Sequence, residues 1–270
     1  MPGGESLLAI GMRYAQRLAA RMHDTKSGLC VGLDPRPGDG GVKECEEFLK
    51  QVIKETAEHA AAFKPNAAYF EAMGSEGIAL LERVIEHMPV EVPVILDVKR
   101  SDIGETQGYY AKACFGSGRV DAVTLNPFLG FDSLQPFLDW EGRGVYLLAV
   151  TSNHGSQDIQ HQRLADGRDV FELVTGLGER AKQDGHPADV GYVVGLTNAG
   201  HVLGKIPDAP LLLPGLGAQG GDLDHLKDGD RKAPSVINVS RGILYADDDR
   251  SFGERAADFA ARIRAVVGEV

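Results

Sequence analysis

Four charged side chains near the ends of two predicted strands carry the strongest chemical signal in this sequence. Asp97 and Lys99 are two residues apart, so in a strand they point to one face, about 7 Å from each other. Asp102 begins the next predicted helix, with Thr106 four residues further on the same side. Lys64, at the end of the adjacent strand, completes an alternating Lys–Asp–Lys–Asp array. A lysine between two carboxylates keeps its ammonium form, so Lys99 is a candidate proton donor.

An ion-pair network that only closes one end of the fold is the alternative interpretation of this array. It is a fair explanation for any one of the four residues alone. Removing four charges from water without a functional reason is costly, however, so the complete set favours a catalytic site. The same charges disfavour Schiff-base chemistry at Lys99, because that chemistry needs an unprotonated amine.

A second candidate site combines a glycine-rich run with an arginine. The run PGLGAQGGD extends from Pro214 to Asp222, and Arg241 lies in the later segment SRG. Glycine backbone can approach an anion closely and offer its N–H groups. Arg241 adds a planar charged fork, and Gln219 can donate through its amide. These features predict a phosphate site, with a flexible turn and a surface arginine as the alternative.

Eight short apolar runs predict the strands that position these side chains. Most of them are nearly continuous rather than alternating, as in parallel strands that are buried on both faces. The runs are 29–34, 61–66, 92–99, 120–126, 144–150, 190–196, 209–217 and 235–241. Amphipathic patterns predict helices at 42–60, 75–88, 165–182 and 251–267, with a further helix at 6–22.

The spacing of the strands predicts the fold. One strand and its crossover helix take ~30 residues, and eight such units in 270 residues are typical of a (β/α)8 TIM barrel. We therefore expect a single domain over 1–270 with an extra N-terminal helix. The alternative is a doubly wound open sheet, which often carries GxGxxG after its first strand, whereas residues 34–41 read DPRPGDGG. The longest interval predicts an enlarged polar loop over 151–164.

The barrel prediction links the two candidate sites. Catalytic groups in such barrels come from the C-terminal strand ends, and the last two loops commonly bind phosphate. Asp34, Lys64, Asp97 and Lys99 stand at predicted strand ends, and Arg241 ends the eighth strand. We therefore expect the charged array and the phosphate site to share one mouth of the barrel.

Composition excludes several other classes of protein. The chain has 39 Asp and Glu against 28 Lys and Arg, a net charge of −11, which argues against nucleic-acid or membrane-surface binding. No apolar run approaches the roughly 18 residues of a membrane span. Three cysteines give neither a disulfide framework nor metal spacing. We expect a soluble, cytoplasmic protein without a bound metal or cofactor.

Several motifs together resemble one enzyme family. The segment LDVKRSDIGET, Leu96 to Thr106, carries the DxKxxDI signature of the orotidine 5′-phosphate decarboxylase family. FKPNAAYFEAMG, TLNPFLGFDSL, TSNHGSQDIQ and PGLGAQGGD are similar to segments of its second bacterial subgroup. Related barrels that act on sugar phosphates share DxKxxD, so the resemblance depends on its combination with FKPN and PGLGAQGG. It extends from about Leu29 to Leu244.

The resemblance implies decarboxylation of orotidine 5′-monophosphate to uridine 5′-monophosphate (UMP) and CO₂, a step of pyrimidine biosynthesis, without a cofactor. Lys64, Asp97, Lys99 and Asp102 would form the family's charged tetrad. Lys99 would deliver the proton to C6 of the pyrimidine, and Asp97 would lie against the substrate carboxylate. Lys64 would orient Asp97 and the ribose hydroxyls.

The resemblance also implies the residues that hold the substrate. They are Asp34 for the ribose, Ser152 and Pro214 for the pyrimidine, and Gln219, Arg241 and Gly242 for the phosphate. Thr151 and Asn153 remain alternatives to Ser152. Asp102, Ile103 and Thr106 would reach the neighbouring subunit's site, which implies a homodimer with sites shared between its chains.

Two other functions remain open at this point. A metal-dependent sugar-phosphate aldolase or decarboxylase of the same barrel group would hold Mg²⁺ with acidic residues at strand ends. Lys64 argues against it, because its charge would repel the metal. A phosphate-binding sensor without catalysis is the other, and the complete set of four charges argues against it.

Overall fold

Eight parallel strands form one sheet in the computed structural model, which describes residues 11–38, 40–216, 223–226 and 231–267. The strand order is β2-β1-β8-β7-β6-β5-β4-β3. The strands are β1 (Leu29–Leu33), β2 (Ala62–Pro65), β3 (Ile95–Arg100), β4 (Ala122–Leu125), β5 (Gly144–Val150), β6 (Asp189–Val194), β7 (Leu211–Pro214) and β8 (Ser235–Val239). Each strand overlaps its predicted range, so the prediction of eight strands is confirmed.

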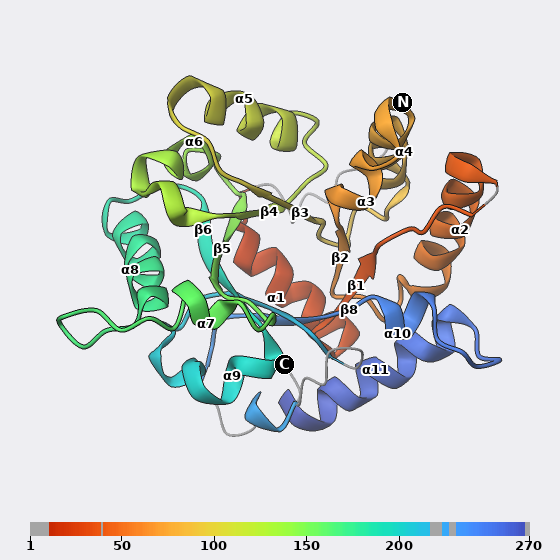
Figure 1. The fold of residues 1–270 in the computed structure, drawn as a ribbon. Coiled ribbons are helices and arrows are strands. Elements are labelled where there is room, and N and C mark those ends of the chain that lie inside the picture. The colour runs from red at the N-terminus through yellow and green to blue at the C-terminus, as the bar shows by residue number, and fades with distance from the viewer. Residues whose placement is uncertain (1–10, 39, 217–222, 227–230, 268–270) are drawn as a thin grey trace.

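The two outer strands of that order, β2 and β3, also meet and close the ring (Figure 1). Parallel bridges join Phe63 to Val94 and Asn66 to Asp97. The N–H of Phe63 donates to the carbonyl of Pro93 at 2.9 Å. A closed ring of eight parallel strands, surrounded by helices, is a (β/α)8 barrel. The open doubly wound alternative is therefore wrong.

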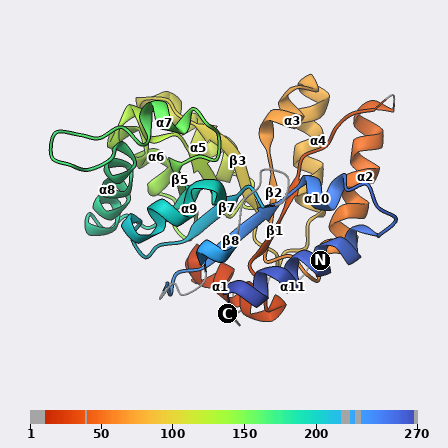
Figure 2. The ribbon, with the colours of Figure 1, turned by 60° about the horizontal axis from the view of Figure 1, so that its bottom comes forward.

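Helices follow the strands and cover the outside of the ring (Figures 1 and 2). The buried apolar faces of these helices pack on the outward side chains of the strands in one large core. The helices are α1 (Tyr14–Thr25), α2 (Gly41–Thr56), α3 (Ala67–Glu71), α4 (Gly74–His87), α5 (Gly104–Phe115), α6 (Gln135–Leu138), α7 (Ser156–Ile159), α8 (Val170–Gln183), α9 (Leu196–Val202), α10 (Arg241–Leu244) and α11 (Phe252–Val267). Short 3-10 turns are η1 (Pro127–Leu129), η2 (Phe131–Ser133), η3 (Leu203–Lys205) and η4 (Asp224–Leu226). Within the described ranges, no helix combines the length and the apolar character needed to cross a membrane.

Helix α1 fills the N-terminal end of the barrel. It lies below the strands in Figure 2, opposite α3 and α7. Tyr14, Leu18 and Met22 pack against the inward side chains of the strands in a second buried cluster. The hydroxyls of Tyr14 and Tyr146 are 2.9 Å apart at the centre of this layer. The extra N-terminal helix is thus present, and it closes one end of the barrel.

Two helix boundaries differ from their predictions for local reasons. Helix α1 spans 14–25 instead of 6–22, because the chain turns at Lys26, whose φ of 51° is left-handed; residues 1–10 lie outside the described ranges. Helix α8 begins at Val170 rather than 165, where the N–H of Asp169 donates to Glu172 at 2.9 Å and caps the first turn. The enlarged loop after β5 is present as predicted and contains α7.

We predict that Gly144→Ala destabilises the barrel, because a Cβ at Gly144 would overlap the buried ring of Tyr14. Overpacking of this kind costs about 1–3 kcal/mol, which urea unfolding would measure. Gly176→Ala is the matched control: nothing lies within 4 Å of its Cβ position in α8, and we expect a gain of roughly 0.4–1 kcal/mol. Equal unfolding midpoints for the two variants would contradict this packing of α1.

Candidate active site

A buried carboxylate between two lysines lies at the C-terminal ends of β2 and β3. Lys64 Nζ donates to Asp97 Oδ2 at 3.0 Å, and Lys99 Nζ donates to Asp97 Oδ1 at 2.6 Å. The Lys64 side chain is 5% exposed and that of Asp97 11%, whereas that of Lys99 is 48% exposed. The structure therefore brings together three of the four predicted charges, and of these Lys99 has the exposed side chain.

The two buried charges of this cluster, Asp97 and Lys64, are held in their ionised forms by their neighbours. Burial alone would raise the pKa of the Asp97 carboxyl, but the ammonium groups of Lys64 and Lys99 outweigh it and hold that pKa well below its usual range. Burial alone would lower the pKa of Lys64, but the charges of Asp97 and Asp34 hold it above its ordinary value. The cluster is thus a fixed array of charges around neutral pH.

Asp102, Ile103 and Thr106 lie apart from this cluster within the chain. Asp102 Oδ1 accepts the N–H of Ile103 at 2.8 Å, and the Ile103 and Thr106 residues are exposed. Helix α5 starts at Gly104, so Asp102 precedes the helix. The predicted placement of Asp102 and Thr106 on one side of a helix is therefore wrong. Among the described residues, Lys99 forms an ion pair with one carboxylate of its own chain, that of Asp97, rather than lying between two.

Asp34 follows β1 at the same mouth of the barrel. Its Oδ1 atom is buried and has no hydrogen-bond partner among the described residues. Tyr245 anchors the backbone here, because its hydroxyl donates to the Asp34 carbonyl at 3.0 Å. This leaves a fixed carboxylate oxygen close enough to influence Lys64.

Pro214, predicted to face the pyrimidine, lies on β7, and the predicted phosphate residues that the structure describes lie on the first turn after β8. Pro214 ends β7, opposite Asn238 of β8. Arg241 begins α10 and is exposed, and its side chain makes no hydrogen bond or ion pair with the residues the structure describes. Gly242 also has a packing role, since a Cβ there would lie 2.7 Å from the Phe259 ring. Gln219 falls outside the described ranges.

The residues after β5 are held from the adjoining elements. The N–H of Thr151 donates to Gln160 Oε1 at 2.8 Å, and the Thr151 hydroxyl donates to Asn153 Oδ1 at 2.6 Å. The Ser152 carbonyl accepts from the Thr197 hydroxyl at 3.3 Å. These contacts fix the loop at the mouth, while the choice among Thr151, Ser152 and Asn153 for the pyrimidine stays open.

Thr124 is a member of the site that the sequence reasoning missed. Its hydroxyl donates to Asp97 Oδ1 at 2.8 Å, and the residue is 1% exposed. The signal available in the sequence was a polar residue inside the apolar run of β4. Asp97 thus accepts hydrogen bonds from three side chains, on β2, β3 and β4.

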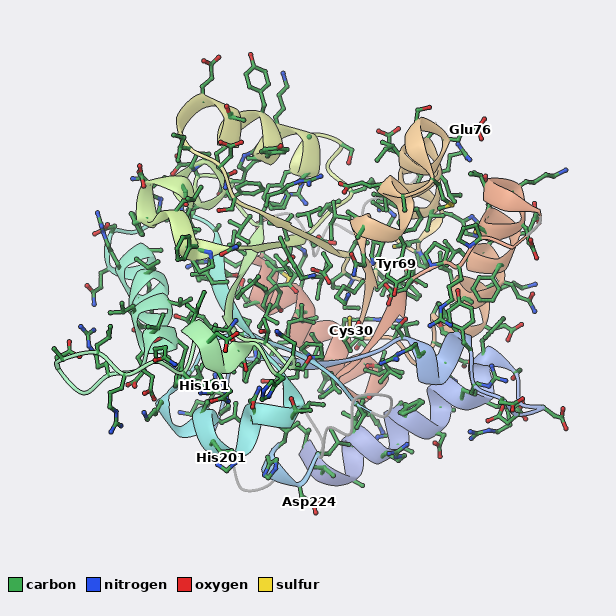
Figure 3. The ribbon with its side chains drawn as sticks, viewed as in Figure 1. Cys30, Tyr69, Glu76, His161, His201 and Asp224 are labelled. Carbon is green, nitrogen blue, oxygen red and sulfur yellow. The ribbon has the colours of Figure 1, made fainter. Side chains whose placement is uncertain are left out.

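Cysteine and histidine side chains take no part in the charged cluster. The three cysteines are free and buried, and burial raises the pKa of the Cys30 thiol to about 12. Figure 3 shows Cys30 in the middle of the ring, with His161 and His201 away from it near the periphery. Among the residues described, no three His, Cys, Asp or Glu side chains are grouped as metal ligands would be.

These features define the class of protein: a (β/α)8 barrel with a buried Lys–Asp–Lys cluster at the C-terminal ends of its strands. Residues 27–256 match the sequence model described as the "Orotidine 5'-phosphate decarboxylase / HUMPS family". The chain belongs to this family, and the resemblance of its motifs is confirmed.

Curated relatives and solved structures agree with this assignment. Orotidine 5'-phosphate decarboxylase of Roseiflexus sp. (strain RS-1) is 41% identical over 94% of this chain and 96% of that protein. The Verminephrobacter eiseniae protein of the same name is 42% identical over 95% and 98%. The structure of Leishmania donovani OMP decarboxylase has a TM-score of 0.82 and 38% identity, covering 94% of this chain and 98% of that one.

We predict that Asp97→Asn lowers the free energy of unfolding by about 3–5 kcal/mol near pH 7, because it leaves Lys64 buried without its counter-charge. The pKa of Asp97 is depressed in the folded state, so its stabilisation is complete above the unfolded value of about 4 and is lost as pH falls toward the folded value. The gap between wild type and variant should therefore narrow below about pH 4, as measured by urea unfolding.

Asp247→Asn serves as the control for this experiment, since Asp247 is exposed and distant in sequence from the cluster. It sets the baseline for removing one surface carboxylate. A gap between wild type and Asp97→Asn that stays constant from pH 7 to pH 3 would show that Asp97 is not held ionised as described.

Proposed function

We propose that this protein is an orotidine 5′-monophosphate decarboxylase, a carboxy-lyase that forms UMP and CO₂. The observation that carries the proposal is the Lys99 ammonium held 2.6 Å from a buried carboxylate that Lys64 also binds. Family membership and the names of relatives about 40% identical over most of the chain support it.

Lys99 supplies the chemistry that this reaction needs. When the bond from C6 to the carboxyl group breaks, its electron pair stays on C6 and the carboxyl group leaves as CO₂. A fixed ammonium beside C6 stabilises this developing charge by preorganised electrostatics. Lys99 then gives one proton to C6, becomes a neutral amine, and regains a proton from water.

Asp97 and Lys64 assist this step: Asp97 acts on the substrate carboxylate, and Lys64 holds Asp97 in place. Lys64 and Lys99 keep Asp97 ionised, so a substrate carboxylate beside it is repelled until CO₂ leaves. Lys64 is almost fully buried and paired, so it fixes the Asp97 carboxylate and reaches toward the ribose hydroxyls. The proton therefore comes from Lys99, whose side chain is half exposed at the mouth.

The remaining substrate contacts follow from positions around the same mouth. Asp34 Oδ1, which has no hydrogen-bond partner in the described part of the chain, suits a ribose hydroxyl. Arg241, exposed at the start of α10, suits the phosphate. The other assignments are Ser152 and Pro214 to the pyrimidine, and Gln219 and Gly242 to the phosphate. Phosphate binding far from C6 contributes binding energy that orients the base.

A metal-dependent sugar-phosphate enzyme of the same barrel group is not favoured. Such an enzyme needs acidic strand-end residues free to bind Mg²⁺. Here both oxygens of Asp97 already accept hydrogen bonds from lysines. The positive charges of Lys64 and Lys99 lie where that metal would have to bind.

We predict that the purified protein decarboxylates orotidine 5′-monophosphate in the presence of EDTA, and that Lys99→Ala lowers kcat by about 10²–10⁴-fold because the proton donor is lost. The fall in substrate absorbance measures both. UMP binding by calorimetry should survive in the variant, because Lys99 is not a phosphate ligand.

Absence of turnover by the wild-type protein, or turnover only with added metal, would overturn the proposed function. Activity of Lys99→Ala within a few-fold of wild type would leave the decarboxylase assignment but remove the role of Lys99 as proton donor. Borohydride trapping of substrate on Lys99 would instead favour a Schiff-base enzyme.

The proposal includes a homodimer in which Asp102, Ile103 and Thr106 reach the partner's site. Large apolar side chains are exposed at the N-cap of α5, on α5 and on η1, and both elements pack near η2 on the β3–β4 side of the barrel: Ile103, Tyr109, Phe128 and Leu129. Phe128 is 78% exposed. A group of this kind beside an active site favours burial against a second subunit. Asp102, which has no contact with Lys99 of its own chain, then completes the partner's site.

We predict that a mixed dimer of Lys99→Ala and Asp102→Ala chains regains one working site, because one of its two sites receives both wild-type residues. Co-expression with two different affinity tags isolates the mixed dimer for the absorbance assay. Each variant homodimer serves as a control and should have low activity. Activity of the mixed dimer no higher than that of the homodimers would contradict a shared site.

Two broader expectations belong to the same proposal. All described elements from α1 to α11 pack around one barrel, which supports a single domain over 1–270. The three buried free thiols suit the reducing conditions of the cytoplasm, where we place the enzyme.

A further inference from the structure

The pairing of β3 with β4 is interrupted beside the charged cluster. Leu96 is opposite Val123, but Arg100 is opposite Leu125. Three residues of β3 (97–99) therefore face a single residue of β4, Thr124. The two strands run side by side in Figure 1. Bulges of this kind re-aim a side chain at the cost of local pairing.

Lys99 occupies a strained backbone conformation within this bulge. Its φ is 46°, in the left-handed region that disfavours a residue with a Cβ. The other such non-glycine residue in the described ranges is Lys26, which ends α1, a common place for it. A strained backbone conformation persists only where surrounding contacts hold it in place. Such conformations are concentrated at functional sites.

One hydroxyl replaces the interrupted pairing and joins the two catalytic groups. The backbone N–H of Lys99 donates to Thr124 Oγ1 at 3.0 Å, and Thr124 Oγ1 donates to Asp97 Oδ1 at 2.8 Å. Because the hydroxyl has one proton, these two bonds run in a single direction, from Lys99 through Thr124 to Asp97. Such a chain polarises its members cooperatively.

We propose that Thr124 is a positioning residue for proton transfer, whose hydroxyl holds the left-handed backbone of Lys99 and the Asp97 carboxylate in register. The inference rests on the proposed decarboxylase function. Without the hydroxyl, the N–H of Lys99 loses its partner and the backbone can relax toward an extended conformation. That relaxation moves Nζ away from its place 2.6 Å from Asp97, and with it the proton from C6.

A purely structural role predicts a different result. If the hydroxyl served only to satisfy a buried N–H, its loss would lower stability and leave kcat unchanged. If it positions Lys99, its loss lowers kcat while KM and UMP binding stay near wild type, since Thr124 itself lies beneath the cluster and is buried. The split between kcat and KM therefore separates the two roles.

Two matched pairs of variants isolate the hydroxyl. Thr124→Val keeps the shape and removes the hydroxyl, while Thr124→Ser keeps the hydroxyl and removes the methyl group. The Thr124→Ala side chain differs from that of Thr124→Ser only in lacking the hydroxyl. If the valine variant does not fold, the comparison of these two variants therefore still tests the role of the hydroxyl. We expect Val and Ala to lose about 10- to 100-fold in kcat, the effect of a small misplacement, and Ser to stay within about three-fold of wild type.

A second readout follows Lys99 without decarboxylation. The group that protonates C6 also removes that proton from the product in the reverse direction. Exchange of the C6 hydrogen of UMP in D₂O, followed by NMR, should slow in Thr124→Val and Thr124→Ala in proportion to kcat.

The outcomes separate the inference from the function on which it rests. Equal kcat for the hydroxyl-containing and hydroxyl-free variants, whether both high or both low, would overturn the role of the Thr124 hydroxyl. Loss of stability with unchanged kcat would overturn it as well. A wild-type protein without turnover would instead overturn the decarboxylase function itself.

Discussion

The rest of the site depends on a carboxylate that is almost fully buried and still ionised. Burial makes the charge of Asp97 unfavourable, and three donors on three different strands compensate: Lys64, Lys99 and Thr124. The positions of β2, β3 and β4 are therefore tied to one side chain. The cluster also explains how a chain of net charge −11 can receive an anionic nucleotide, because its cations are gathered inside one mouth while the acidic excess lies elsewhere.

The same carboxylate stands at the place where the barrel closes. β2 and β3 meet through isolated bridges instead of a full ladder, and one of these bridges joins Asn66 to Asp97. The ion pair between Lys64 and Asp97 crosses this same junction. Side-chain charges thus reinforce the place where backbone pairing is sparsest. The closure of the barrel and the charged cluster therefore share one junction, between β2 and β3.

Much of this arrangement could be predicted from the sequence, and the remainder shows why some of it could not. Continuous apolar runs located all eight strands because both faces of each strand are buried. Spacing alone placed Lys64, Asp97 and Lys99 together. Thr124 was not predicted, because its neighbours along the chain do not show that it faces a bulge on another strand. The predicted placement of Asp102 at the start of a helix was wrong, because α5 begins two residues later than expected.

The closed N-terminal end of the barrel has a consequence for substrate entry and product release. Helix α1 fills that end with Tyr14 and its neighbours, and the pair of Tyr14 and Tyr146 completes the layer. Among the described residues, this leaves the opposite end of the barrel, where the Lys99 side chain is exposed, for the entry of substrate and the release of UMP and CO₂. Substrate entry, product release and the return of a proton to Lys99 then share the same end of the barrel.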